Sequence, residues 1–128
     1  YVGFTGEVPL WLDEGVAQWE EPEKRAIVRG VMKTVFESGK ALGLKELTQS
    51  DIRGEKDEEK VNNFYIQAVS LIDFMVKQFG SDDFISFCRG LRDGKTLDEA
   101  LRFTYPTSMR NLNELEEKWK KYISNATV

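Results

Sequence analysis

The segment from residue 59 to residue 79 constrains the fold of this chain more than any other feature. Its apolar side chains are spread around most of a helical circumference instead of alternating with polar ones. These side chains are Val61, Phe64, Tyr65, Ala68, Val69, Leu71, Ile72, Phe74, Met75, Val76 and Phe79. A helix that is apolar on nearly every side must be covered by several other elements. We therefore expect this segment to be the central helix of the protein.

Every other periodic segment of the 128-residue chain is also helical in pattern, and none alternates as a half-buried strand does. The predicted helices cover about 9–21, about 23–42, about 59–79, a segment from Ser81 to just before Gly94, a short segment through Leu97 and Leu101, and a last one through Leu112 and Tyr122. The polar stretch 48–58 is typical of a surface loop. The sequence predicts an all-α fold, a compact array of about six helices in a single domain over residues 1–128.

Short-range signals indicate where several helices begin and end. Pro22 is expected to close the first helix, because proline interrupts a helical interior. Gly43 is expected to take the left-handed conformation that ends the second helix. Ser81 is expected to cap the fourth helix through its hydroxyl group.

The two short C-terminal helices each follow a possible capping box. Thr96 is followed three residues later by Glu99, and Asn111 is followed in the same way by Glu114. In a capping box, each of the two side chains accepts a hydrogen bond from the backbone N–H of the other residue. We expect a full box at Thr96 and a looser version at Asn111.

Composition excludes several classes of function. The net charge is −4 and the isoelectric point is near 5.0, so the chain lacks the excess of basic residues that a nucleic-acid-binding surface requires. The mean hydropathy is −0.45, and no apolar run approaches the ~20 residues of a membrane-spanning helix. We expect no nucleic-acid partner and no membrane segment in this chain, and its cellular compartment cannot be inferred.

The absence of histidine narrows the possible chemistry further. With no histidine, the chain cannot supply a Ser-His-Asp triad, a Cys-His pair or the imidazole ligands of an ordinary catalytic zinc. The single cysteine, Cys88, lies among Phe84, Ile85, Phe87 and Leu91. Such apolar surroundings indicate an inert, buried thiol.

Glu14 is a carboxylate on a largely apolar part of the first predicted helix. On a helical wheel it points in the direction of Trp11 and Gln18, so we expect it to be partly buried. A partly buried carboxylate needs a cation, hydrogen-bond donors or a metal to offset its lost hydration. The alternative is a structural glutamate that pairs with an arginine or caps a neighbouring helix. Gly15, beside it, would let another backbone approach closely.

The segment 9–17, PLWLDEGVA, resembles the P-x-W-L-x-E-G-x-A segment of gluzincin metallopeptidases, the peptidase MA-like proteins and the relatives of aminopeptidase N. In that family the glutamate is the third protein ligand of a zinc ion, after two histidines of an upstream H-E-x-x-H helix. Glu14 matches this position. The resemblance implies that the chain is the C-terminal helical subdomain of a zincin-like metallopeptidase catalytic domain.

The resemblance continues through the rest of the chain, in the order and spacing of segments 65–68, 79–80, 91–94, 97–100 and 115–119. Tyr65 matches a family tyrosine that donates a hydrogen bond to the oxyanion of the tetrahedral intermediate. From the residues alone, the better interpretation of Tyr65 is a core tyrosine whose hydroxyl reaches a backbone partner. The chain has Gln67 and Ala68 where the family commonly has K-G, so it departs from an ordinary aminopeptidase.

In the family the H-E-x-x-H motif ends on the order of twenty residues before the glutamate, because its helix must finish and the chain must turn back. Only 13 residues precede Glu14, and the chain begins with Tyr1 instead of methionine. We expect the chain to be a piece of a longer protein whose N-terminal half carries the motif. A metal-free relative that has lost the histidines is the competing interpretation.

The resemblance implies hydrolysis of a peptide or protein substrate, with zinc in the intact parent protein. There, zinc would activate a water, the upstream glutamate would accept its proton, and Tyr65 would share the charge of the intermediate. Glu14 would be the metal ligand of this chain and Tyr65 its catalytic residue. The chain alone is expected to bind no zinc and to be inactive. The alternative is a non-catalytic helical protein-interaction domain descended from such a peptidase.

Overall fold

The computed structural model describes residues 10–39, 41, 43–49 and 54–124. All regular structure in these residues is helical, which confirms the all-α prediction. The helices are α1 (Leu10–Trp19), α2 (Pro22–Glu37), α3 (Leu44–Gln49), α4 (Glu58–Phe79), α5 (Ser81–Arg92), α6 (Leu97–Thr104) and α7 (Leu112–Ser124). The short α3 is not among the helices that the sequence predicts. No described helix is both long enough and apolar enough to cross a membrane.

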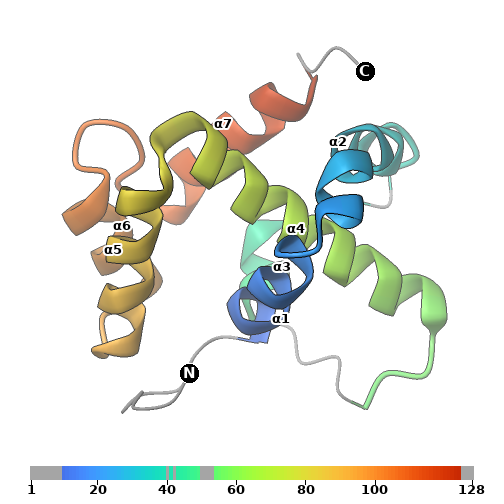
Figure 1. The fold of residues 1–128 in the computed structure, drawn as a ribbon, viewed down its shortest axis with the longest axis horizontal. Helices are drawn as coiled ribbons and strands as arrows, with labels where there is room; N and C mark the ends of the chain where they lie inside the picture. Colours follow the sequence, from blue (N-terminus) through green and yellow to red (C-terminus); the bar gives the residue numbers. More distant parts are fainter. Residues whose placement is uncertain (1–9, 40, 42, 50–53, 125–128) are drawn as a thin grey trace.

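Helix α4 is the centre of the molecule, as its apolar circumference predicts. It contacts α1, α2, α3, α5 and α7. Figure 1 shows it running diagonally through the molecule, with α5 and α6 beyond its C-terminal end. Ten of its residues are buried, in a nearly continuous run from Phe64 to Met75. The other helices therefore build one core around α4, and Trp11, Met32, Phe87, Leu101 and Trp119 all belong to it.

The ends of α1 and α2 differ from the prediction. Pro22 does not close the first helix; α1 ends at Trp19, and Pro22 opens α2, where its missing N–H is not needed. Helix α2 ends at Glu37, and the left-handed residue after it is Gly39 (φ 76°) instead of Gly43. The expected last residue of this helix, Leu42, lies outside the described residues.

The start of α5 also differs. Ser81 is its first helical residue and makes no capping hydrogen bond; Gly80, with φ 94°, occupies the N-cap position. Only glycine adopts such a φ without strain, so the chain turns at Gly80 and is already helical at Ser81. The expected apolar face of α5 is present, because Phe84, Phe87 and Leu91 are buried.

The capping box at the start of α6 is confirmed. The backbone N–H of Thr96 donates to Oε1 of Glu99 (3.0 Å), and the backbone N–H of Glu99 donates to Oγ1 of Thr96 (3.2 Å). Both otherwise unpaired donors at the helix start are thereby satisfied. These hydrogen bonds lower the pKa of Glu99, the bond from the Thr96 backbone contributing most.

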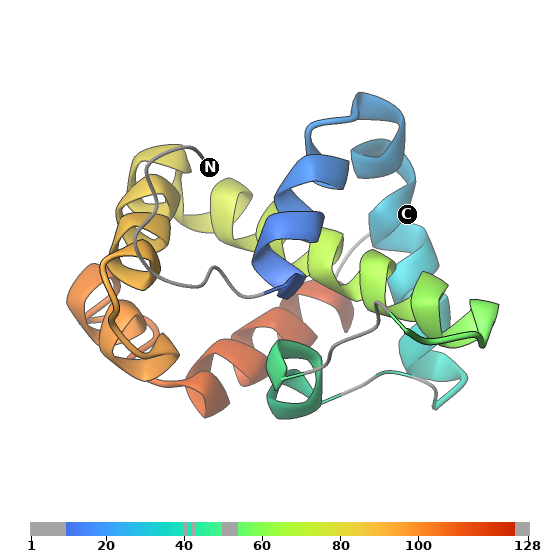
Figure 2. The same ribbon diagram turned by 90° about the horizontal axis from the view of Figure 1, so that it is seen from below.

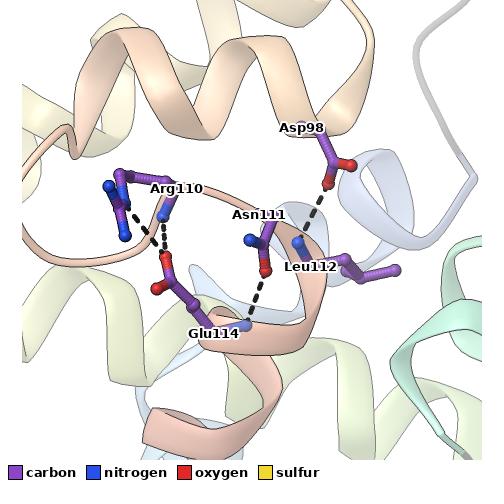
Figure 3. Close-up of polar contacts among 5 residues, drawn as sticks. All are labelled: Asp98, Arg110, Asn111, Leu112 and Glu114. Atoms are coloured by element: carbon purple, nitrogen blue, oxygen red, sulfur yellow. Dashed lines mark hydrogen bonds and ion pairs between the residues drawn. The ribbon is translucent and has the colours of Figure 1, made fainter.

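The start of α7 carries a looser cap that also joins it to α6 (Figure 3). Asn111 Oδ1 accepts a hydrogen bond from the Glu114 backbone N–H (2.9 Å). Glu114 Oε1 accepts from the backbone N–H of Arg110 (2.8 Å) instead of from that of Asn111, so the reciprocal bond is shifted by one residue. Asp98, in the first turn of α6, accepts from the Leu112 backbone N–H (2.9 Å). This bond links the start of α7 to the first turn of α6.

Candidate functional site

Helices α1 and α4 pack tightly against each other at Gly15. A Cβ atom placed there would lie 2.6 Å from Ile72 Cδ1 and 3.1 Å from Ala68 Cβ, so no side chain fits without movement. Figure 2 shows α1 lying across the middle of α4. The expectation that Gly15 admits a neighbouring backbone is confirmed. The contact places Glu14, the preceding residue, at the edge of the α1–α4 interface.

A polar contact also holds the C-terminal end of α1 on α4. Trp19 Nε1 donates a hydrogen bond to Oδ1 of Asp73 at 3.2 Å. Asp73 is buried, with an exposed fraction of 2%, and its carboxylate also lies 3.4 Å from Lys77 Nζ. The guanidinium carbon of Arg25 lies 4.8 Å from the centroid of the Trp19 ring. Helix α1 is thus held on α4 at two points, Gly15 and Trp19.

Glu14 is half-buried, as the helical wheel predicts. Within the part of the chain that the structure describes, its carboxylate has no hydrogen bond and no ion pair. The described polar atoms that are both fully buried and unpaired belong to Trp11, Thr104 and Tyr105, so the Glu14 oxygens reach the surface. Neither the arginine partner nor the capping role of the structural alternative is seen among these residues.

Tyr65 is half-buried on α4, one turn before Ala68. Its ring packs edge-on against Phe64, with centroids 5.7 Å apart and planes at 76°. None of the described residues exchanges a hydrogen bond with its hydroxyl, which is not among the fully buried unpaired atoms. A core tyrosine with a backbone partner would have a hydroxyl that is both buried and hydrogen-bonded. The hydroxyl is therefore available to a ligand.

Tyr65 forms part of the wall of a pocket of about 380 Å³ between the end of α1, α2 and α4. The residues that line it are Gln18, Lys24, Val28, Val31, Asn62, Tyr65, Ile66 and Val69. Glu14 is not one of them, but Gln18 follows it by one helical turn on the same side of α1. The sequence does not predict this pocket. Its one local signal is that Val28 and Val31, which both line it, lie one turn apart on the second predicted helix.

Cys88 is half-buried among the side chains of α5, and burial raises the pKa of its thiol to about 11. A thiol with such a pKa is almost entirely protonated near neutral pH and is a poor nucleophile. The structure therefore agrees with the inert thiol that the sequence predicts.

The donors present do not make a complete zinc site. Within residues 10–39, 41, 43–49 and 54–124 there is no group of three His, Cys, Asp or Glu side chains that could hold a metal ion. Glu14 offers one carboxylate, whereas a catalytic zinc requires three protein ligands. Any metal bound through Glu14 must take its other ligands from elsewhere.

The family model of the peptidase MA superfamily matches residues 3–125, which is nearly the whole chain. No curated protein and no solved structure matches the chain.

Proposed function

The chain belongs to the peptidase MA superfamily, and we propose that it is the C-terminal helical part of a zinc-dependent peptidase of the gluzincin type. The observation that supports this best is the pair of available polar groups beside the α1–α4 contact. Glu14 and Tyr65 are both half-buried, and neither has a polar partner among the described residues. Both groups can therefore meet a ligand without first giving up a hydrogen bond within the described part of the fold.

Glu14 has the role of a metal ligand in this proposal. It is held at the edge of a rigid contact, because Gly15 packs directly on Ala68 and Ile72. This packing holds the backbone that carries the carboxylate in a defined position on α4. It supplies one oxygen, and the remaining ligands come from an N-terminal half of the same catalytic domain, which is the partner of this chain.

Tyr65 has the role of an oxyanion donor. A neutral phenol can donate a hydrogen bond to the negative oxygen that develops when a peptide carbonyl is attacked. Its hydroxyl is available, and its ring is held by Phe64, so the donor is oriented before a substrate arrives. The substrate class is a peptide or protein.

The rival proposal is a non-catalytic helical interaction domain that has kept the scaffold. The stretch upstream of Tyr1 in the parent protein distinguishes the two. An H-E-x-x-H motif on the order of twenty residues before Glu14 supports the peptidase, and a helix without that motif supports the interaction domain.

Calorimetry with zinc is the direct test of the proposed function. The present chain alone should not bind zinc stoichiometrically at micromolar concentration, whereas a chain that includes the upstream half should bind one ion and hydrolyse peptides. Absence of both properties from the longer chain would exclude the peptidase and leave the interaction domain.

A further inference from the structure

The pocket beside Tyr65 has apolar walls and a polar rim. Val28 and Val69 form its floor, with exposed fractions of 4% and 3%. Val31 and Ile66 are half-buried and complete the apolar lining. Asn62 is exposed and therefore lies at the mouth. A concave, mainly apolar site with a few polar groups at its edge is the usual form of a ligand pocket, and its volume lies within the range of such pockets.

Two of the polar groups at the mouth, Lys24 and Gln18, are paired with each other. Lys24 Nζ lies 2.8 Å from Glu21 Oε2 and donates a hydrogen bond to Gln18 Oε1 at 3.1 Å. Lys24 thus already has a carboxylate partner, and the described residues that line the pocket include no other cation. What a ligand meets inside is the valine and isoleucine surface.

The position of the pocket relates it to the proposed reaction. Tyr65 belongs both to the pocket wall and to the proposed oxyanion site, and Gln18 lies one turn beyond Glu14. Side chains of an extended peptide follow one another at about 3.3–3.6 Å per residue. A substrate carbonyl that faces the Tyr65 hydroxyl would therefore have a neighbouring side chain within reach of the pocket.

We infer that this pocket is a specificity subsite that accepts a large apolar side chain, such as leucine, next to the scissile bond of a peptide substrate. The inference rests on the proposed function for its link to cleavage. Binding of the apolar side chain is driven by burial of apolar surface. It needs neither zinc nor the hydrogen bond that Tyr65 would donate to the oxyanion. It can therefore be measured in the metal-free chain.

The first experiment uses methyl-detected NMR on the present chain, titrated with N-acetyl-leucinamide and, separately, with N-acetyl-glycinamide. We expect the leucine compound to bind with a dissociation constant on the order of millimolar, as suits so small a ligand. It should bind at least about 10-fold more tightly than the glycine compound, because it buries a leucine side chain. The chemical-shift changes should be largest for the methyl groups of Val28, Val31, Ile66 and Val69. Equal binding of both compounds, or shifts elsewhere, would overturn the inference.

A pocket-filling variant and a matched control make the test specific. Val31→Phe should fill the pocket and weaken binding of the leucine compound at least about 10-fold. Val76→Phe makes the same change at a half-buried position of α4 that does not line the pocket, and should leave binding within about 2-fold. Thermal unfolding of both variants checks that they fold. Unchanged binding in a folded Val31→Phe would contradict the assignment.

Repetition in the longer, zinc-binding chain separates this inference from the proposed function. Hydrolysis that is indifferent to the residue beside the scissile bond would refute the subsite and leave the peptidase. Selective leucine binding without hydrolysis would refute the peptidase and leave the pocket as a site for apolar side chains. Loss of leucine binding in the longer chain would mean that its N-terminal half fills the pocket, which would overturn the inference.

Discussion

Trp19 and Asp73 are joined by a hydrogen bond that crosses from the last residue of α1 to the buried face of α4, 54 positions later. The indole Nε1 donates to a carboxylate that is 2% exposed, so the bond satisfies part of a buried charge. Because Glu14 lies on the same ten-residue helix, whatever holds Trp19 also limits how α1 can move.

Replacement of Trp19 by phenylalanine removes this donor while it keeps an aromatic ring. We expect the Trp19→Phe variant to lose about 1–3 kcal/mol of unfolding free energy, because Asp73 stays buried with one donor fewer. Urea unfolding measures the loss. In a double-mutant cycle with Asp73→Asn, the two changes should be non-additive by more than about 0.5 kcal/mol. Strict additivity would show that the bond contributes nothing to stability.

Gly15→Ala tests the close contact between α1 and α4. In an exposed helix this change stabilises by up to about 1 kcal/mol, because alanine favours the helical backbone. Here the new methyl group would meet Ile72 Cδ1 at 2.6 Å and the Ala68 carbonyl carbon at 3.3 Å, and the second of these is backbone. We expect a net loss of about 1–3 kcal/mol in urea unfolding, as for other overpacked cores.

Gly90→Ala is the matched control for this prediction, because Gly90 is also a buried helical glycine. Its nearest neighbour would be the flexible Lys95 Cδ at 3.3 Å, followed by Ala100 Cβ at 3.4 Å. The change should alter stability by less than about 1 kcal/mol in either direction. Equal effects of the two substitutions would contradict a specific contact at Gly15.

The capping box predicts a dependence of stability on pH. Hydrogen bonds from Thr96 lower the pKa of Glu99 below its ordinary value of 4.5. A group whose pKa is lower in the folded state stabilises the fold above its unfolded pKa, and this contribution is lost as the pH falls through the folded value. Stability should therefore decline as the pH is lowered from about 5 into the acidic range. The Glu99→Gln variant should show a smaller decline.

Urea unfolding at pH 6 and at pH 3 measures this difference. Glu117→Gln, which changes an exposed glutamate of α7, serves as the control. The loss of unfolding free energy from pH 6 to pH 3 should be smaller in Glu99→Gln than in the unmodified chain. Equal losses would argue against a stabilising role for the ionised Glu99 carboxylate in the capping box.

Sequence patterns predicted the parts of the fold that depend on neighbouring residues. The apolar circumference of α4 and the box at Thr96 are local, and both are present. The end of α2 was missed because Gly39 and Gly43 are equally able to end a helix. The choice follows from packing: Phe36, whose ring lies 5.1 Å from that of Trp119, is the last side chain that α2 packs into the core.

Distant contacts explain what the sequence could not show. Helix α3 is too short to show a period, and the Leu44 backbone N–H at its start donates to Glu116 Oε2 from 72 positions away (2.5 Å). The pocket forms only where α1, α2 and α4 meet, so no local sequence pattern predicts it. Glu14 and Tyr65 were singled out by type and spacing. That they share one site stays a prediction.

The last prediction concerns the separate roles of Glu14 and Tyr65 in a chain that includes the upstream half. Glu14→Gln should lower zinc affinity, because an amide is a weaker ligand than a carboxylate, whereas Asp13→Asn, one position away, should not. Tyr65→Phe should leave zinc affinity unchanged and slow turnover by about 100-fold, since one oxyanion donor is lost. Calorimetry and peptide hydrolysis separate these effects. Unchanged turnover in Tyr65→Phe would reduce Tyr65 to a wall of the pocket, and unchanged zinc affinity in Glu14→Gln would remove Glu14 from the metal site.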